Sequence, residues 1–231
     1  MTEASCPPHS FATTRTLATL AAALTLTLGV MGLGGCGPHR AVTPARPHYA
    51  GEVYLLRGLF NVWSTGMDEI GKKLQARGVK GEVLPGPEWL ILGEHILSRR
   101  QKLSHQDPLV LVGHSYGADD AVRLARFLEG KNVTVDALVL VDPTTPPTIP
   151  ANVKRCFNLF KSRPSTDWMP WFRGIAVHVK NRKTQLLNYD LRLHDPTGRY
   201  ANLDHFKIDN NPDVHGIVIR EILRSLTPRR G

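Results

Sequence analysis

A serine stands between two glycines in the segment 109–119, which reads LVLVGHSYGAD. Ser115 follows a run of aliphatic residues, and Gly113 and Gly117 flank it in the pattern Gly-x-Ser-x-Gly. A buried strand that leads through this pattern into a helix predicts a sharp, strained turn, in which side chains at the flanking positions would clash. Such a turn would present the serine hydroxyl as a nucleophile. A serine nucleophile needs a base that takes its proton and a third group that orients the base.

The residues around this serine alternate between strand-like and helix-like patterns from residue 51 onward. This order predicts one α/β domain with a mostly parallel sheet and helices on both faces. The predicted strands are 53–57, 79–84, 109–112, 137–141, 153–160 and 185–193. The predicted helices are 66–77, 88–103, 116–129 and a last helix that begins at Pro212 after the capping residue Asn211. The helix that begins at Tyr116 would point its free N–H groups towards the serine, which favours an oxyanion there.

From about residue 51 to residue 226 the chain resembles an α/β-hydrolase, because GHSYGAD matches the nucleophile motif of that family. The resemblance is greatest to small lipase-like and thioesterase-like members. It implies the chain order serine, acid, histidine and an oxyanion hole made of two backbone N–H groups. One donor would be Tyr116, and the other Leu59 in the loop RGLF. This loop resembles the family's His-Gly-x signature, with arginine in the place of the histidine.

Asp142 is the favoured acid, because it ends the predicted strand ALVLVD. The carboxyl ends of parallel strands meet at one edge of a sheet, so Asp142 is expected beside Ser115. Thioesterase-like members of the family place their acid at this position. Many other members place it one strand later, which corresponds here to Asp167 in the loop SRPSTDWMPW, and Asp167 stays open as the alternative. Asp142 could also be a simple turn residue before Pro143.

The chain contains ten histidines that could act as the base. His205 lies in the loop LDHFKIDNN, after the last strand-like segment and before the final helix, where the family places its catalytic histidine. His215 is the main alternative, although it falls inside the final helix. His114, within the serine motif, is expected to point into the packing.

The first 50 residues are expected to lie outside the fold. Residues 17–33 are apolar and uncharged behind a short segment that carries Arg15, as in a secretory signal peptide. They lead into LGGC, which resembles the bacterial lipobox and predicts lipidation at Cys36. The chain would then be exported, as a membrane-anchored lipoprotein or to the periplasm or cell exterior; signal cleavage without lipidation and an uncleaved anchor stay open. The predicted domains are a signal peptide 1–35, a linker 36–50 and a hydrolase domain 51–231.

Charge and cysteine content limit the possible partners. The formal net charge is +9, but the basic residues are scattered and no helix-turn-helix or zinc-finger pattern accompanies them, so nucleic-acid binding is not expected. A basic surface would instead favour anionic lipid and reinforce an acyl anchor. Once Cys6 is removed and Cys36 acylated, Cys156 has no partner for a disulfide. No cluster of metal ligands is recognisable, and neither a metal nor a cofactor is expected.

These patterns predict a serine esterase or thioesterase that acts on a small-molecule acyl ester or thioester through an acyl-enzyme on Ser115. Two loops, 143–150 and 162–174, could form a lid over an apolar acyl pocket. The large apolar residues of the second loop, which could also be simple core, are Trp168, Met169, Trp171 and Phe172. The alternative is a non-catalytic binding lipoprotein that retains the hydrolase fold, since a fold does not determine a function. Acyl transfer by the same residues and the oligomeric state also stay open.

Overall fold

The computed structural model describes residues 40–42, 48–58, 64–103, 106–169 and 174–229. These residues belong to the unit Gly37–Gly231. The apolar segment 17–33, Cys36 and Leu59 lie outside the described residues. Within the described ranges, every helix is too short or too polar to span a bilayer.

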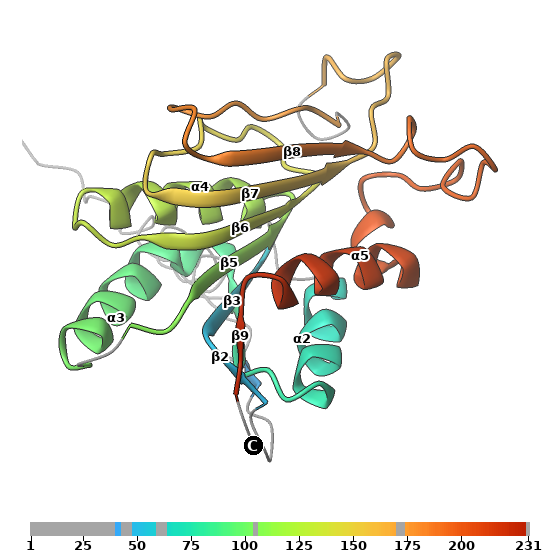
Figure 1. Ribbon diagram of the computed structural model, residues 1–231. Coiled ribbons are helices and arrows are strands. Elements are labelled where there is room, and N and C mark those ends of the chain that lie inside the picture. Colours follow the sequence, from blue (N-terminus) through green and yellow to red (C-terminus); the bar gives the residue numbers. More distant parts are fainter. Residues whose placement is uncertain (1–39, 43–47, 59–63, 104–105, 170–173, 230–231) are drawn as a thin grey trace, which may run out of the picture. The chain divides into compact units, whose positions relative to one another are not determined.

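A seven-stranded sheet forms the centre of this unit, in the order β1-β4-β3-β5-β6-β7-β8 (Figure 1). Neighbouring strands from β4 to β8 are parallel, and β1 pairs antiparallel with β4. The strands are β1 (Arg40–Val42), β3 (Glu52–Arg57), β4 (Gly81–Pro85), β5 (Leu109–His114), β6 (Val135–Val141), β7 (Val153–Phe160) and β8 (Gln185–Asp190). A separate antiparallel pair joins β2 (Tyr49–Ala50) to β9 (Thr227–Pro228). The predicted mostly parallel sheet is confirmed.

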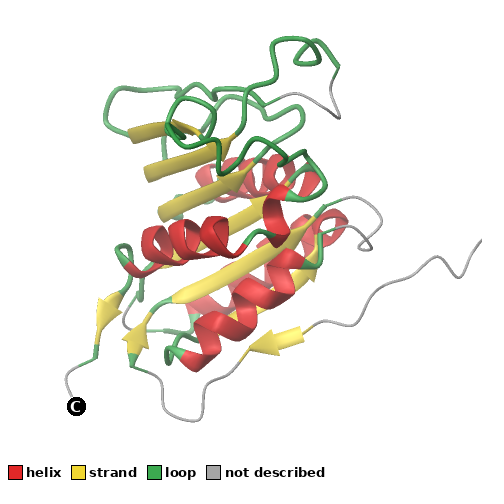
Figure 2. Cartoon of the chain, turned by 90° about the vertical axis from the view of Figure 1, so that its right-hand side faces the viewer, coloured by secondary structure: helices red, strands yellow, loops and turns green. Residues whose placement is uncertain are grey.

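Helices cover both faces of the sheet, as predicted (Figures 1 and 2). The helices are α2 (Gly66–Ala76), α3 (Trp89–Gln101), α4 (Tyr116–Glu129) and α5 (Pro212–Leu223), with short 3-10 turns η1 (Gly86–Glu88) and η2 (Ile208–Asn210). Successive residues of a strand point to opposite faces. Leu55 therefore belongs to the core under α2 and α5, and Leu56 to the core under α3 and α4. This burial on both faces explains why the central strands β5 and β6 are almost continuously aliphatic.

The sequence correctly predicted where several helices and strands begin and end. Strand β7 and helix α4 have the predicted bounds, and the side chain of Asn211 caps α5 by accepting hydrogen bonds from two first-turn N–H groups. Helix α3, however, ends at Gln101, so the predicted end at residue 103 was wrong, and Leu103 lies beyond the helix with 44% of its surface exposed. Strands β1 and β2 lie within the segment assigned to a linker.

Candidate active site

The turn between β5 and α4 has the strained geometry that the glycines predict. Ser115 adopts φ 58° and ψ −129°, a left-handed backbone that side chains rarely adopt. A Cβ added to Gly113 would lie 2.2 Å from the carbonyl oxygen of Gly117, and one added to Gly117 would lie 2.3 Å from that of Leu56. Both positions therefore require glycine, and the tight contact places Ser115 at the carboxyl edge of the sheet.

Strand register brings Asp142 beside this serine. His114 and Val141 are paired residues at the ends of β5 and β6, and the Ser115 N–H donates to the carbonyl oxygen of Val141 over 3.0 Å. Asp142 is the next residue, has φ 45° and is fully buried. Serine and aspartate thus occupy equivalent positions just beyond two adjacent parallel strands.

His205 links the two side chains. Its Nε2 lies 2.8 Å from Ser115 Oγ, and its Nδ1 lies 2.9 Å from Asp142 Oδ2. A carboxylate only accepts, so Nδ1–H donates to Asp142 and Nε2 is left to accept the hydrogen of the serine hydroxyl. The serine is 8% exposed and the histidine 3%, so the hydrogen-bonded chain is almost closed to bulk water.

The two alternative residues lie elsewhere. His215 sits inside α5, with Nδ1 2.7 Å from Lys73 Nζ and Nε2 2.5 Å from the carbonyl oxygen of Asp209, and burial lowers its pKa. The Asp167 carboxylate accepts hydrogen bonds from backbone N–H groups of its own loop. Of the candidates for acid and base, the structure brings Asp142 and His205 to Ser115.

His114 supports the site from below. Its Nε2 donates to the carbonyl oxygen of His205 over 3.0 Å, and its Nδ1 accepts from the Ser64 hydroxyl over 2.9 Å. The same hydroxyl accepts from the Gly58 N–H over 2.9 Å. Burial and the neighbouring His205 lower the pKa of His114 to about 3, so its imidazole is neutral. This relay joins the loop after β3 to the loop that carries His205.

Asp119 anchors the loop that follows Asp142. It is fully buried in the first turn of α4, and its carboxylate accepts from the N–H groups of Thr144 and Thr145 over 3.1 and 2.8 Å. Burial raises the pKa of Asp119 to about 6. The anchored Thr144 hydroxyl lies 3.3 Å from Ser115 Oγ. The sequence analysis did not predict this contact. An acidic residue four positions after Ser115, on a helix face that is otherwise apolar, indicated a buried carboxylate with specific partners.

Strand β7 supplies two further groups beyond its end. The Lys161 N–H lies 3.3 Å from Asp142 Oδ1, and Arg163 Nη2 donates to Asp142 Oδ2 over 3.1 Å. The Lys161 ammonium donates to three carbonyl oxygens of the loop that leads to His205, those of Tyr200, Ala201 and Leu203. These basic residues hold the acid and the histidine loop together, and their roles were not predicted.

The expected oxyanion hole is described in part. Tyr116 is the first residue of α4, so its N–H has no partner within the helix. The second expected donor, Leu59, lies outside the described residues. Its neighbour Gly58 lies against Ser115, because a Cβ added to Gly58 would be 3.1 Å from Ser115 Cβ. The loop after β3 therefore begins beside the serine.

The apolar residues predicted to line an acyl pocket in the loop 162–174 are described only in part. Trp168 is 76% exposed, Met169 is half-buried, and Trp171 and Phe172 lie outside the described residues. Cys156 is a buried free thiol whose pKa is raised to about 12 by burial, so it is not a nucleophile. The described residues contain no group of three or more His, Cys, Asp or Glu placed to hold a metal ion.

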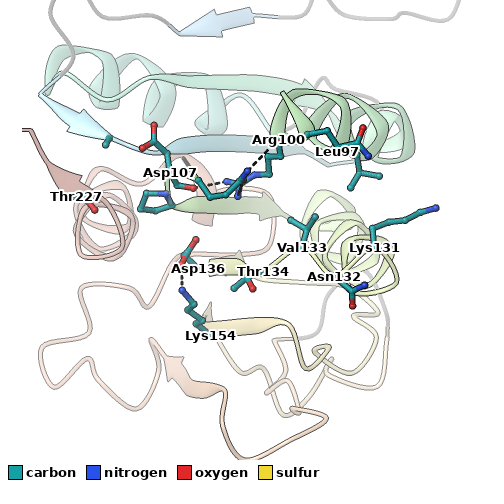
Figure 3. A pocket seen from close by; sticks show the side chains of 14 residues that line it. Leu97, Arg100, Asp107, Lys131, Asn132, Val133, Thr134, Asp136, Lys154 and Thr227 are labelled. Atoms are coloured by element: carbon teal, nitrogen blue, oxygen red, sulfur yellow. Dashed lines mark hydrogen bonds and ion pairs between the residues drawn. The ribbon is translucent and has the colours of Figure 1, made fainter. Parts of the chain in front are cut away.

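A cleft of about 740 Å³ lies at the opposite edge of the sheet (Figure 3). Pro108 and Asp136, at the amino ends of β5 and β6, form part of its wall. Within it, Lys154 pairs with Asp136 over 2.7 Å, and Arg100 donates to the carbonyl oxygen of Asp107 over 2.7 Å. The cleft shares no residue with the Ser115 site.

No protein-family model and no curated protein matches the chain. Among solved structures, the chain is similar to the NocB thioesterase domain from the nocardicin cluster, with 12% identity, a TM-score of 0.47, and coverage of 80% of this chain and 98% of that one. It is also similar to YbtT, a type II thioesterase from the yersiniabactin pathway, with 12% identity, a TM-score of 0.45, and coverage of 82% and 98%. The type II thioesterase BorB from the borrelidin cluster gives 13% identity, a TM-score of 0.45, and coverage of 80% and 97%. The strand order and the serine turn at the end of β5 make the fold α/β-hydrolase-like.

Proposed function

We propose that the protein is a serine hydrolase that cleaves a carboxylic ester or thioester through an acyl-enzyme on Ser115. The observation that carries this proposal is the chain of hydrogen bonds from Ser115 Oγ through His205 to Asp142. It starts from a serine held at positive φ at the end of a parallel strand. Nucleophile, base and orienting acid are thus within the distances that acyl transfer requires.

In the first half-reaction, Ser115 Oγ attacks the acyl carbonyl carbon while its proton moves to His205 Nε2. Asp142 stabilises the imidazolium that forms, and its hydrogen bond keeps Nδ1 protonated throughout. The imidazolium then gives its proton to the leaving alcohol or thiol. In the second half-reaction, His205 takes a proton from a water molecule, which attacks the carbonyl carbon of the acyl-enzyme. His205 then returns this proton to Ser115 Oγ as the bond between Oγ and the acyl carbon breaks, and the carboxylic acid is released.

The negative charge of the tetrahedral intermediate would develop at the start of α4. The N–H of Tyr116 and the positive end of the helix dipole favour an oxyanion there. We assign the second donor to the N–H of Leu59, because Gly58 lies against Ser115. Backbone donors do not depend on the identity of the side chain, so the arginine at position 57 is compatible with this role.

Hydrolysis of a p-nitrophenyl acyl ester and of an acyl thioester by the full chain tests the proposal. We expect Ser115→Ala and His205→Ala to lower kcat by at least about a thousandfold, and Asp142→Asn to lower it by a comparable factor. His215→Gln is the matched control and should keep wild-type activity, since its ring contacts Lys73 and Asp209 rather than the triad. A Ser115→Ala protein as active as wild type would contradict the proposal.

We further propose that the enzyme is exported and lipidated at Cys36. The support is the apolar segment 17–33 followed by LGGC. Labelled palmitate should enter the full chain in bacterial cells and be absent from Cys36→Ser. Labelling that persists in Cys36→Ser, or an unlabelled wild type, would contradict lipidation at this residue.

A further inference from the structure

We propose that Arg163 is a positioning residue: its guanidinium places a permanent positive charge beside the Asp142 carboxylate and thereby sets the lowest pH at which His205 can act as a base. The charge would act on the protonation of the His205 ring, and its effect on reaction rate rests on the proposed function. Arginine remains charged at any pH at which the protein is folded, so this charge does not vary with conditions.

The geometry places one carboxylate oxygen between two donors. Asp142 Oδ2 accepts from His205 Nδ1 over 2.9 Å and from Arg163 Nη2 over 3.1 Å. The two nitrogens are therefore no more than about 6 Å apart. Asp142 is fully buried and the Arg163 side chain is 15% exposed, so solvent screens this interaction only in part.

The loop that carries Arg163 is fixed on both sides. The Arg163 N–H donates to both oxygens of Asp167, over 2.9 and 2.8 Å, and the Gly174 N–H donates to the same carboxylate over 2.9 Å. On the other side, the Ser162 N–H donates to Asp190 Oδ1 over 3.0 Å. Asp167, the alternative acid of the sequence analysis, thus holds the backbone from which the guanidinium reaches Asp142.

The positive charge changes how strongly Asp142 stabilises protonated His205. An isolated carboxylate would favour the imidazolium in the resting enzyme, and protonated histidine cannot act as a base. The guanidinium on the same oxygen opposes that protonation. At a separation of about 6 Å, Coulomb's law gives an effect of roughly half a pH unit at the dielectric constant of water and about two pH units at that of a protein surface.

Several other titratable groups lie near His205, and Arg163 acts on one of them: burial and, after it, the charge of Arg163 lower the pKa of Lys161, which stays charged over the acid limb. His114, whose ring centroid is 5.3 Å from that of His205, is neutral. Asp209 Oδ2 lies 3.7 Å from His114 Nδ1, on the far side of that ring. Lys161 remains bound to the carbonyl groups of the histidine loop, and the neighbouring Asp204 pairs with Lys207 over 2.9 Å. Asp209, whose pKa burial raises to about 7, titrates in wild type and variant alike, so the comparison of the two proteins isolates the charge at residue 163.

Two measurements on the full chain test the inference. The first is the midpoint pH of the His205 ring titration by NMR, with the resonance assigned by its loss in His205→Gln. The second is the midpoint of the acid limb of the rate of fluorophosphonate labelling. In Arg163→Gln both midpoints should rise by about half to two pH units. Arg163→Lys keeps the charge and should stay within a few tenths of a unit of wild type.

Arg123→Gln is the matched control, because Arg123 pairs with Asp120 on α4 and touches no triad residue. Its midpoints should equal those of wild type. Should Arg163→Gln fail to fold, Arg163→Met retains the alkyl stem without the charge and should show the same rise.

Unchanged midpoints in the charge-removing variants, with labelling slower at every pH, would overturn the inference and leave Arg163 a purely structural role. A midpoint that rises by NMR in a protein whose wild type does not label would support the charge effect and overturn the hydrolase function. Normal labelling of wild type with unchanged midpoints in the charge-removing variants would overturn the charge effect and support the hydrolase function.

Discussion

The imidazole of His114 donates a 3.0 Å hydrogen bond to the carbonyl oxygen of His205, so the buried histidine of the serine motif holds the backbone of the candidate base. The Ser64 hydroxyl fixes its other nitrogen. The two histidines are 91 positions apart in the chain, and their contact ties the serine turn to the last loop of the domain.

Removal of this support should loosen the histidine loop. We expect His114→Ala to lower the rate of ester hydrolysis by about ten- to a hundredfold and the free energy of unfolding by about 1–3 kcal/mol, since two buried hydrogen bonds are lost. Kinetics and urea unfolding of the full chain measure the two effects. Retention of wild-type rate in a destabilised variant would show that the loop holds its geometry without His114.

The Asp119 contact makes a separate prediction for the loop after β6. Asp119→Ala removes the acceptor for the N–H groups of Thr144 and Thr145, so the Thr144 hydroxyl should leave Ser115 Oγ. We expect kcat for ester hydrolysis to fall by about tenfold. Asp120→Asn, at the next position of α4, is the control and should have little effect on kcat. Equal losses in both variants would count against a specific role for Asp119.

The buried carboxyl group of Asp209 should make the stability of the fold depend on pH. Burial raises its pKa to about 7, so the folded protein binds this proton more tightly than the unfolded chain. The stabilisation is therefore fully present below about pH 4 and is lost as pH rises to about 7, by up to about 1.4 kcal/mol per pH unit. The asparagine of Asp209→Asn does not titrate. The free energy of unfolding of wild type, relative to that of Asp209→Asn, should therefore fall over that pH range.

Denaturant unfolding of both proteins from pH 4 to pH 8 measures the difference. The comparison with the variant matters because His114, whose pKa is lowered to about 3, contributes the opposite slope below its ordinary pKa. Asp213→Asn, a substitution of an exposed aspartate, is the control. A constant difference between wild type and Asp209→Asn would contradict the prediction.

The glycine at position 117 makes a prediction about packing. A Cβ there would lie 2.3 Å from the carbonyl oxygen of Leu56 and 2.4 Å from that of Arg57, and both contacts are with backbone. We expect Gly117→Ala to destabilise the fold by about 2–4 kcal/mol and to displace Ser115. Gly216→Ala, on α5, meets only the end of a flexible arginine and should be neutral or slightly stabilising in the same unfolding assay.

The parts of the fold that depend on local sequence could be predicted. The aliphatic run before GHSYG determines β5, and the glycines leave room for the turn. Asp142 could be located because it directly follows the next buried strand. Asn211 and Pro212 place the start of α5, and therefore place His215 inside a helix.

The rest depends on contacts between distant residues. Strand β1 has three residues and exists through its pairing with β4, so no local pattern marks it. Ser64 and Arg163 lie in loops, and their roles follow from how these loops meet around His114 and Asp142. For the same reason the sequence left Asp167 open as an acid, whereas its carboxylate binds the backbone of its own loop.

Fluorophosphonate labelling of the full chain, with the modified peptide located by mass spectrometry, tests the central claim most directly. The account predicts a single phosphonyl adduct on Ser115 in wild type, none in Ser115→Ala, and labelling at least about a hundredfold slower in His205→Ala. A folded wild-type protein that does not label, or an adduct on another residue, would contradict an activated Ser115 and favour a binding protein with a hydrolase fold.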